Sequence, residues 1–484
     1  MKGRRIPRMK KNKIPNMTEG PIFTRIFAFC LPIMITNLLQ VFYNAADMMV
    51  VSLSPVKDAV GAVGTTGAFI SLITNIFIGF ATGANVVVAK NIGAGKHDGV
   101  SRATHTSLAM SLVFGVVSAF VGILVSRPVL SLMGAQATLL DLAVTYTNIY
   151  FAGIPFIATT NYLIAIFRAK GDTKTPLFVL ALSGIINVVL NYIFVVFLGL
   201  SVEGVALATV TANAVSTVVL TWRLSRDDGP CRFSFKKLCF DKKSFFDILH
   251  IGIPAGLQGS LFSISNMMIQ SSIIQVNNAL CPPGSAYDAV VNGNAAASNL
   301  DGFVYTAQNS VYQGAITFTS QNNGAKKYER VYRILLSCYV LGTIFALSTA
   351  AIIFIGREPL LSLYGVRDAA EGTLEHIAYN TAMIRMYWVS IPYFMVSYME
   401  IGSGVVRGLG KSVSSTIISL LGACLLRVVW LMTVFKMYPT LEIIYLSYPV
   451  TWVITGTVQL LYAIFVIKKY IKHRDDEMPA PRIQ

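Results

Sequence analysis

The stretch YNAADMMVV, residues 43–51, places a single carboxylate, Asp47, inside a long apolar run. Polar side chains precede it at helical spacing and would form a band along one helix face: Thr36, Asn37, Gln40, Tyr43 and Asn44. An ionisable group on such a face should look into a cavity, where it can bind and release a proton or a cation. The alternative is a solvated helix end, because Asp47 lies 22 residues after Arg25, or roughly 33 Å of helix.

A second acid lies in a polar segment that has apolar sequence on both sides. This segment, residues 292–314, contains Asp301. Topology favours a cavity-lining helix over an external loop, because the hydrophobic flanks have to be connected across the membrane. Asp301 then either binds a cationic substrate or pairs with Arg385 or Arg427, and we favour the structural pairing.

A third acid, Glu400, lies seven residues before Arg407 and close to a helix end. An interfacial position and a functional role in a cavity explain it equally well. The neighbouring candidate helix offers no acid: residues 254–270 contain amides, including Gln258 and Asn266, which we expect in a substrate cavity.

The sequence shows no set of residues typical of an enzyme active site. The six cysteines and five histidines are scattered and show no metal-ligand spacing. The sequence contains no P-loop, Ser/His/Asp set or dinucleotide fingerprint. We expect neither an enzyme nor ATP-driven transport by this chain alone, and no cofactor or bound metal beyond a coupling proton or sodium ion.

Composition assigns the chain to a bilayer, since hydrophobic residues make up 54% of 484 positions and charged residues only 13%. A window of about 19 residues predicts twelve membrane helices. Their ranges are 23–51, 60–89, 103–125, 138–167, 176–198, 203–224, 244–276, 286–320, 332–355, 375–405, 413–436 and 442–467.

The net charge of +16 would suggest nucleic acid in a soluble protein, but its distribution indicates membrane topology instead. With the N-terminus in the cytoplasm, 32 of the 39 Lys and Arg residues fall at cytoplasmic ends and loops and five face outward. The positive-inside rule therefore predicts that both termini are cytoplasmic.

Motifs of the first half recur in the second at offsets of 222 to 240 residues. NIGAGKHDGVSR (91–102) is answered by NNGAKKYERVYR (322–333), and RAKGDTKTP (168–176) by RGLGKSVSS (407–415). Because each half has an even number of helices, both halves enter the membrane from the same side and should be related by an axis along its normal. Such duplication favours a transporter over a receptor or a membrane enzyme.

Together with NVVLNYIF (187–194), VEGVALAT (202–209) and EIGSGVVRGLG (400–410) followed by RVVW (427–430), these motifs resemble the MATE transporters, the multidrug and toxic compound extrusion family. The similarity runs from about residue 20 to residue 470. The resemblance implies a V-shaped pair of six-helix bundles that exports organic cations and other amphipathic compounds in exchange for protons or sodium.

The resemblance also suggests which residues couple transport to an ion. Asp47 matches the coupling acid of the first helix, and Asn187, Asn191 and Thr209 match the polar cluster around it. Many members carry Asp where this chain has Asn191, so fewer anionic ligands are available here for sodium. We therefore prefer protons to Na⁺ at this cluster, since a carboxylate in a low-dielectric pocket can hold a proton near neutral pH.

Two further features complete the expected site. Asn161 fits a polar cavity position of the family, although a helix-packing role explains it equally well. Pro32 and its counterpart Pro254 cannot donate a backbone hydrogen bond and are predicted hinges of their helices.

We therefore expect an all-α integral membrane protein with two six-helix bundles related by a pseudo-two-fold axis along the membrane normal. It would be a monomeric antiporter of a bacterial inner membrane that takes a small-molecule substrate and no nucleic acid. The alternative is an exporter of a lipid-linked or anionic metabolite with the same fold. The predicted segments are a basic N-terminus (1–22), two bundles (23–224 and 244–467), a cytoplasmic linker (225–243) and a cytoplasmic tail (468–484).

Overall fold

The computed structural model describes residues 17–52, 56, 59–132, 137–281 and 287–477, which contain helices and no strand. Most of the predicted N-terminal segment and the end of the predicted tail lie outside these residues. The helices of the first half are α1 (Ile22–Ser52), α2 (Ala59–Gly93), α3 (His97–Leu132), α4 (Ala137–Ala152), α5 (Ile154–Ala169), α6 (Lys174–Tyr192), the π-helical η1 (Ile193–Phe197) and α7 (Val202–Ser225).

The second half begins after a linker that contains the short 3-10 helix η2 (Phe235–Lys237). Its helices are α8 (Lys242–Leu280), α9 (Ala289–Gly324), α10 (Tyr328–Ile355), α11 (Arg357–Leu363), α12 (Leu374–Arg385), η3 (Met386–Ser390), η4 (Ile391–Tyr393), α13 (Phe394–Gly408), α14 (Ser412–Ser419), η5 (Leu420–Leu425), α15 (Leu426–Met432), α16 (Val434–Met437) and α17 (Leu441–Glu477). The last helix continues ten residues past its predicted end at residue 467, because the tail sequence IKKYIKHRDDE is a good helix former once α17 has started.

The helices form the twelve spans that the sequence predicts. Among the described residues, length and apolar composition alone identify nine spans, or ten if α4 and α5, which meet at a bend of 49°, cross together. The two remaining spans, α9 and α12–α13, are too polar for that criterion. Because α9 packs against α1, α2, α10, α12 and α13, most of its polar side chains lie inside protein rather than in lipid.

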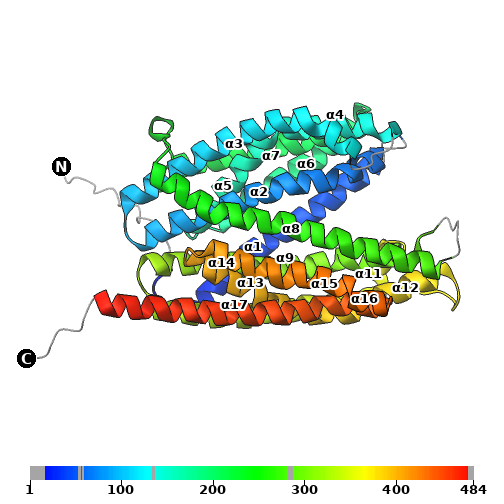
Figure 1. Ribbon diagram of the computed structural model, residues 1–484. Coiled ribbons are helices and arrows are strands. Elements are labelled where there is room, and N and C mark those ends of the chain that lie inside the picture. The colour runs from blue at the N-terminus through cyan, green and yellow to red at the C-terminus, as the bar shows by residue number, and fades with distance from the viewer. Residues whose placement is uncertain (1–16, 53–55, 57–58, 133–136, 282–286, 478–484) are drawn as a thin grey trace, which may run out of the picture.

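The helices form two bundles, with α2–α7 above and α9–α17 below in Figure 1 and with α1 and α8 crossing between them; α1 begins and α17 ends at the same end of the molecule. The bundles meet through six helices: α1 packs against α9 and α10, α8 packs against α2 and α3, and α2 packs against α9. In the sequence repeat α8 and α9 correspond to α1 and α2, so these contacts exchange under a pseudo-two-fold axis that runs along the helices.

Glycines allow α2 and α8 to lie backbone against backbone. Gly79 and Gly83 lie one turn apart on α2, and Gly252 and Gly256 lie one turn apart on α8. A Cβ atom built on Gly252 would lie 2.8 Å from the Cα of Phe80, closer than packed atoms approach. In a bilayer, where helices gain little from the hydrophobic effect, such small-residue surfaces supply van der Waals contact.

A second crossing closes the end of the molecule where the termini lie. Gly93 at the end of α2 contacts the carbonyl of Gln321, and Gly324 at the end of α9 contacts the carbonyl of Lys90. The two glycines are 231 residues apart, the offset of the sequence repeat that contains them. Gln321 also donates to the carbonyl of Ala169 across the bundles at 2.8 Å. The glycine-rich motifs therefore serve as helix-crossing surfaces.

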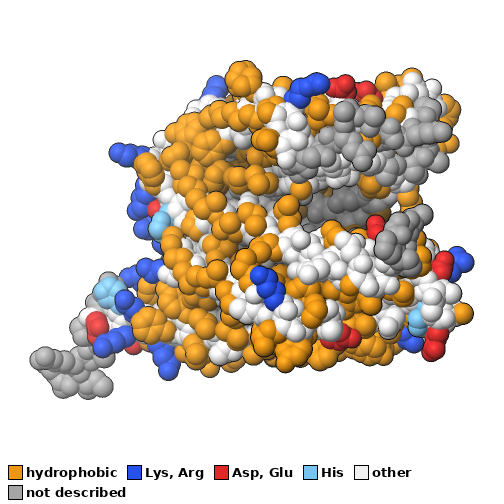
Figure 2. Space-filling model, turned by 45° about the vertical axis from the view of Figure 1, so that its right-hand side comes forward, with side chains coloured by type: hydrophobic (Ala, Val, Ile, Leu, Met, Phe, Trp, Pro, Cys, Tyr) orange, Lys and Arg blue, Asp and Glu red, His pale blue; other side chains and the backbone are white. Residues whose placement is uncertain are grey.

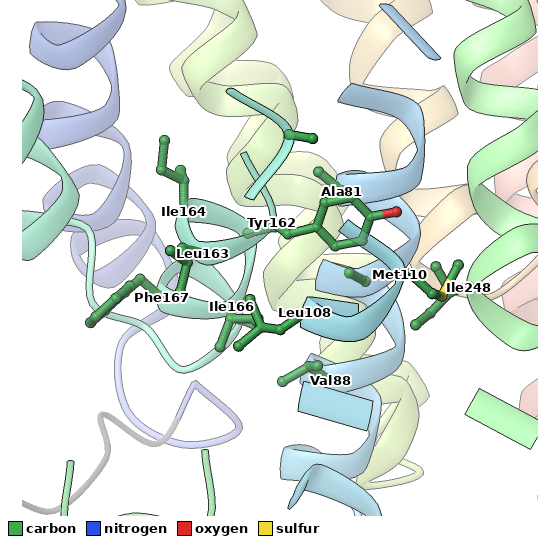
Figure 3. Packing of buried hydrophobic residues seen from close by; sticks show 14 of the residues in the cluster. Ala81, Val88, Leu108, Met110, Tyr162, Leu163, Ile164, Ile166, Phe167 and Ile248 are labelled. Carbon is green, nitrogen blue, oxygen red and sulfur yellow. The ribbon is translucent and has the colours of Figure 1, made fainter. Parts of the chain in front are cut away.

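The distribution of apolar and charged side chains is that expected of a protein in a bilayer. Figure 2 shows hydrophobic side chains over most of one face, Lys and Arg gathered at the end that carries the termini, and a hollow between the bundles at the opposite end. Figure 3 shows the core of the first bundle, where Tyr162 of α5 packs beside Ala81 of α2 and Met110 of α3. This packing holds α2, α3 and α5 together.

Alanine at Gly93 or Gly324 should destabilise the closed end, because the new Cβ would meet a carbonyl of the other bundle that cannot move without displacing a helix. We expect a loss of about 1–3 kcal/mol. The measurement is the thermal unfolding midpoint of the purified protein in detergent.

Gly67→Ala is the matched control in α2, since a Cβ there meets nothing within 4 Å. It should leave the midpoint unchanged or raise it slightly. Equal midpoints for Gly93→Ala and Gly67→Ala would refute the crossing.

Candidate functional site

A hydrogen-bonded chain joins the four residues that resemblance assigned to ion coupling. The Nδ2 of Asn191 on α6 donates to the Oδ1 of Asp47 on α1, and also to the Oδ1 of Asn187 at 3.3 Å. The Nδ2 of Asn187 in turn donates to the hydroxyl of Thr209 on α7 at 3.4 Å. The carboxylate on α1 therefore contacts α6 directly and is linked to α7 only through Asn191 and Asn187.

The surroundings of Asp47 define what this cluster can do. Asn191 is fully buried and Asn187 is nearly so, while Asp47 is partly exposed. The Oδ1 of Asn191 has no hydrogen-bond partner in the described part of the chain, so one acceptor beside the carboxylate is unused. The described residues contain no group of three His, Cys, Asp or Glu side chains that would hold a metal ion. One carboxylate among amides suits a proton better than a multivalent metal.

One π-helical turn adjoins this cluster, and another adjoins the residues around Asp301 in the second bundle. The π-helical η1 starts two residues after Asn191, and η3 contains Ser390, which binds Asp301. π-helical turns inside α-helices occur frequently at functional sites because they displace one residue from the helical register.

In the second bundle, Asp301 of α9 forms a buried ion pair with Arg385 of α12, with Nε and Oδ2 2.9 Å apart. Ser390 donates to the other carboxylate oxygen. Arg385 also donates to the Oδ1 of Asn294 at 2.9 Å, and Tyr445 donates to the same oxygen at 3.0 Å. The sequence left the partner of Asp301 open between two arginines, and the structure pairs it with Arg385.

Arg427, the other candidate partner, is buried but pairs with no carboxylate in the described chain. It stacks on the ring of Tyr448 at 4.2 Å and donates to the hydroxyl of Thr451 at 3.1 Å. Cation–π contact and one neutral hydrogen bond therefore replace an ion pair.

A cavity of about 450 Å³ lies between the bundles. Five of the eight residues predicted for a substrate cavity line it: Gln40 and Asn44 from α1, Asn161 from α5, Gln258 from α8 and Glu400 from α13. The cavity thus receives polar side chains from both halves, as a site for alternating access requires.

Three predicted cavity residues lie elsewhere. Asp301 is in the ion pair inside the second bundle, and the hydroxyl of Tyr43 donates to the carbonyl of Ala181 within the first bundle at 3.1 Å. Asn266 is exposed on α8 and does not line the cavity. Helical spacing places residues on a common face, but it does not indicate whether that face meets the cavity or a neighbouring helix.

Two arginines that the sequence analysis assigned to topology do line the cavity. They are Arg168 in the last turn of α5 and Arg407 in the last turn of α13. Their equivalent positions in the repeat, each seven residues after a predicted cavity residue, were the signal that could have identified them. The positive-inside rule alone would place both arginines at the cytoplasmic surface of the membrane rather than in the cavity.

The predicted hinge prolines lie within continuous helices in this conformation. α1 passes through Pro32 and α8 passes through Pro254. The carbonyl of Pro32 accepts a hydrogen bond from the hydroxyl of Thr36 at 2.8 Å, an interaction that often accompanies a bend.

Comparisons with known proteins agree on one family. The MatE family model matches residues 32–193 and 264–433. The chain is similar to the probable multidrug resistance protein YoeA of Bacillus subtilis, 26% identical over 461 residues that cover 93% of this chain and 96% of that protein. It is also similar to the probable multidrug resistance protein NorM of Thermotoga maritima, 22% identical over 415 residues, 84% of this chain and 85% of that protein.

Solved structures show the same fold. A MOP superfamily transporter from Pyrococcus furiosus superposes with a TM-score of 0.85 at 21% identity, over 96% of this chain and 100% of that one. A structure described as the outward-facing conformation of a multidrug resistance MATE family transporter gives the same TM-score and coverage.

Asp301→Asn should destabilise the protein by about 3–5 kcal/mol, because it leaves the buried guanidinium of Arg385 without its carboxylate. Lower yield and a lower thermal unfolding midpoint of the purified protein would report the loss. Combining it with Arg385→Met should recover part of the midpoint, since no unpaired charge then remains.

The control is Glu442→Gln, which removes an exposed acid from the same bundle and should change stability little. An Asp301→Asn protein as stable as this control would show that the ion pair contributes nothing to folding.

Proposed function

The chain belongs to the MatE family, and on that premise we propose that it is a secondary active exporter that moves small amphipathic molecules outward in exchange for protons. The proposed site of the proton is Asp47, with Asn187, Asn191 and Thr209 as its hydrogen-bonding partners. The proposed substrate site is the cavity between the bundles.

One observation carries this proposal: α1 connects the two sites. Asp47 accepts a hydrogen bond from α6, while Asn44, one turn earlier on the same helix, lines the cavity. A change at the carboxylate that moves α1 relative to α6 therefore also changes the cavity wall. Such a shared element is what couples a proton to a substrate.

The chemistry at Asp47 follows from its single charge. An ionised carboxylate accepts a charge-assisted hydrogen bond from Asn191, which is about twice as strong as a neutral one. Protonation removes the charge and weakens that bond, so the proton changes how firmly α1 is held against α6. Pro32 is the proposed bending point, because it lacks the amide hydrogen that would stiffen the helix.

The relatives' names supply the first substrates to test. YoeA and NorM are described as probable multidrug resistance proteins. We propose organic cations and other amphipathic drugs as the first compounds to test on this chain. A second candidate function, export of a lipid-linked or anionic metabolite, is favoured by the two arginines of the cavity. Sodium remains the competing coupling ion, and parallel pH and sodium gradients distinguish the two.

The proposed setting is a bacterial inner membrane with both termini and the 225–243 linker in the cytoplasm. The hollow between the bundles then faces outward and the glycine crossing of α2 and α9 closes the cytoplasmic end. The proposed functional units are the bundles 23–224 and 244–467 of a monomer.

Asp47→Asn should lower pH-driven efflux at least about ten-fold, because the amide has nearly the size of the carboxylic acid but cannot cycle between charge states. Efflux of a lipophilic dye such as ethidium from loaded, reconstituted vesicles is the measurement, at equal protein abundance. Substrate binding to the purified variant should persist.

Asp141→Asn provides the control, since Asp141 is an exposed acid of the same bundle in a surface pair with Arg127. Wild-type rates for both variants would remove Asp47 from the coupling site and direct attention to Glu400.

The proposed topology makes a prediction for a natural cysteine. Cys239, on the linker, is exposed, whereas Cys30, Cys231, Cys281 and Cys338 are buried. A membrane-impermeant maleimide should label Cys239 in inside-out vesicles and not in intact cells. The opposite pattern should hold for Thr440→Cys, an exposed position between α16 and α17, in a Cys239→Ser background. Labelling of Cys239 from outside would reverse the orientation and the export direction.

A further inference from the structure

The central cavity carries an excess of positive charge. Its charged lining residues are Arg168, Arg407 and Glu400, two cations and one anion. A site built for organic cations would avoid an excess of arginine, whereas this cavity, although Phe262, Tyr305 and Tyr312 also line it, has one more cation than anion. We propose that Arg168 and Arg407 together bind an oxyanion of the substrate, a carboxylate or a phosphate, and that the exported molecule is therefore an amphipathic anion or zwitterion. This inference rests on the proposed exporter function and specifies its substrate.

Arg168 is the main observation. Its side chain makes no hydrogen bond and no ion pair with any other described residue. It nevertheless lines a cavity between two bundles, at the end of α5. The negative end of the helix dipole offsets part of the cost of this charge, but it leaves the five donors of the guanidinium unused. An unpaired guanidinium that faces a cavity is arranged to receive a ligand.

Arg407 faces the same cavity from the other bundle with neutral partners only. It donates to the hydroxyl of Tyr312, to the Oε1 of Gln258 at 2.6 Å and to the hydroxyl of Thr416 at 3.3 Å. It is 4% exposed, its Nε has no partner, and no described carboxylate lies within ion-pair distance. These contacts fix the orientation of the guanidinium without an ion pair, and Glu400 on the same helix offsets only part of its charge.

The internal repeat relates these cavity residues as two pairs of equivalent positions. Arg168 and Arg407 are 239 residues apart, and so are Asn161 and Glu400, each of which lies two turns earlier on the same helix as its arginine. All four line the cavity. The arginines are therefore equivalent positions of the two bundles, whereas the amide of Asn161 stands where the second half has a carboxylate.

This pairing explains how the substrate would be held and released. Arginine forks bind carboxylate and phosphate through two parallel hydrogen bonds. Arg168 offers such a fork, whereas both Nη atoms of Arg407 already donate within the second bundle, so Arg407 would attract the same oxyanion mainly through its charge. Once the bundles move apart, one arginine no longer reaches it and the affinity falls. Glu400, two turns away, remains available for a positive group on a zwitterionic substrate.

The test uses two dyes with one xanthene scaffold and opposite charge, fluorescein as the anion and rhodamine 123 as the cation. Fluorescence polarisation measures their binding to the purified protein. We expect fluorescein to bind more tightly, and Arg168→Gln and Arg407→Gln each to weaken it about ten-fold or more, which corresponds to about 1.4 kcal/mol. Arg168→Lys should recover part of the loss, because it restores the charge without the fork.

The matched control is Arg226→Gln, which removes an arginine that stacks on Trp222 outside the central cavity and should leave fluorescein binding unchanged. Competition by benzoate and by phenyl phosphate distinguishes a carboxylate site from a phosphate site. Tighter binding of rhodamine 123 by the wild type overturns the proposal, and so does unchanged fluorescein binding by Arg168→Gln.

Vesicle transport separates this proposal from the exporter function. Fluorescein binding that depends on both arginines, without transport in any pH or sodium gradient, supports the anion site and refutes the exporter. Gradient-driven efflux of rhodamine 123 that exceeds fluorescein efflux, with both dyes equally slowed by Arg168→Gln, supports the exporter and refutes the anion site.

Discussion

The structure depends on one constraint, that a polar group in hydrocarbon must find its partner inside the protein. This chain places its polar spans, α9 and α12–α13, where other helices surround them, and leaves apolar side chains on the outside. The buried charges are paired, as Asp301 with Arg385, stacked on an aromatic ring, as Arg427 on Tyr448, or kept at the surface of an internal cavity. In this protein, polar residues in a spanning segment therefore mark a buried ion pair, a buried hydrogen bond or the wall of the cavity.

The two bundles share a framework and differ in their buried chemistry. The framework is the glycine-mediated packing of α2 against α8 and α9, which lets the halves approach closely at one end while they separate at the other. In the first bundle Asp47 accepts a hydrogen bond from the amide of Asn191 and forms no ion pair with a described residue. In the second bundle the acid is fixed by arginine and serine. In our proposal the first half of this duplicated fold exchanges protons, whereas the second half is held by the buried Asp301–Arg385 ion pair.

Much of the fold could be predicted from the sequence. Apolar runs gave twelve segments, and the repeat of NIGAG and NNGAK indicated two related halves, because each motif is dictated locally by helix length and helix crossing. The approach of Asn191 to Asp47 spans 144 residues, and only a family resemblance suggested it. The partner of Asp301 and the cavity position of Arg168 depend on how whole helices rotate against one another. Spacing within one helix carries no information about that rotation, so Tyr43 and Asn266 were assigned to a cavity that they do not line.

The central claim is that protonation of Asp47 loosens α1 from α6 and, because α1 also packs against α9 and α10, thereby changes the relative position of the bundles. Pulsed electron–electron distance measurements test it most directly, with spin labels at Leu198 and Thr440, exposed positions on the two bundles at the end opposite the termini, in a Cys239→Ser background. We predict that the distance distribution shifts between about pH 5 and about pH 8, a range that brackets carboxyl titration in a partly buried site. With Asp47→Asn it should stay at the acidic distribution at every pH. A pH-dependent shift that persists in Asp47→Asn would contradict the account.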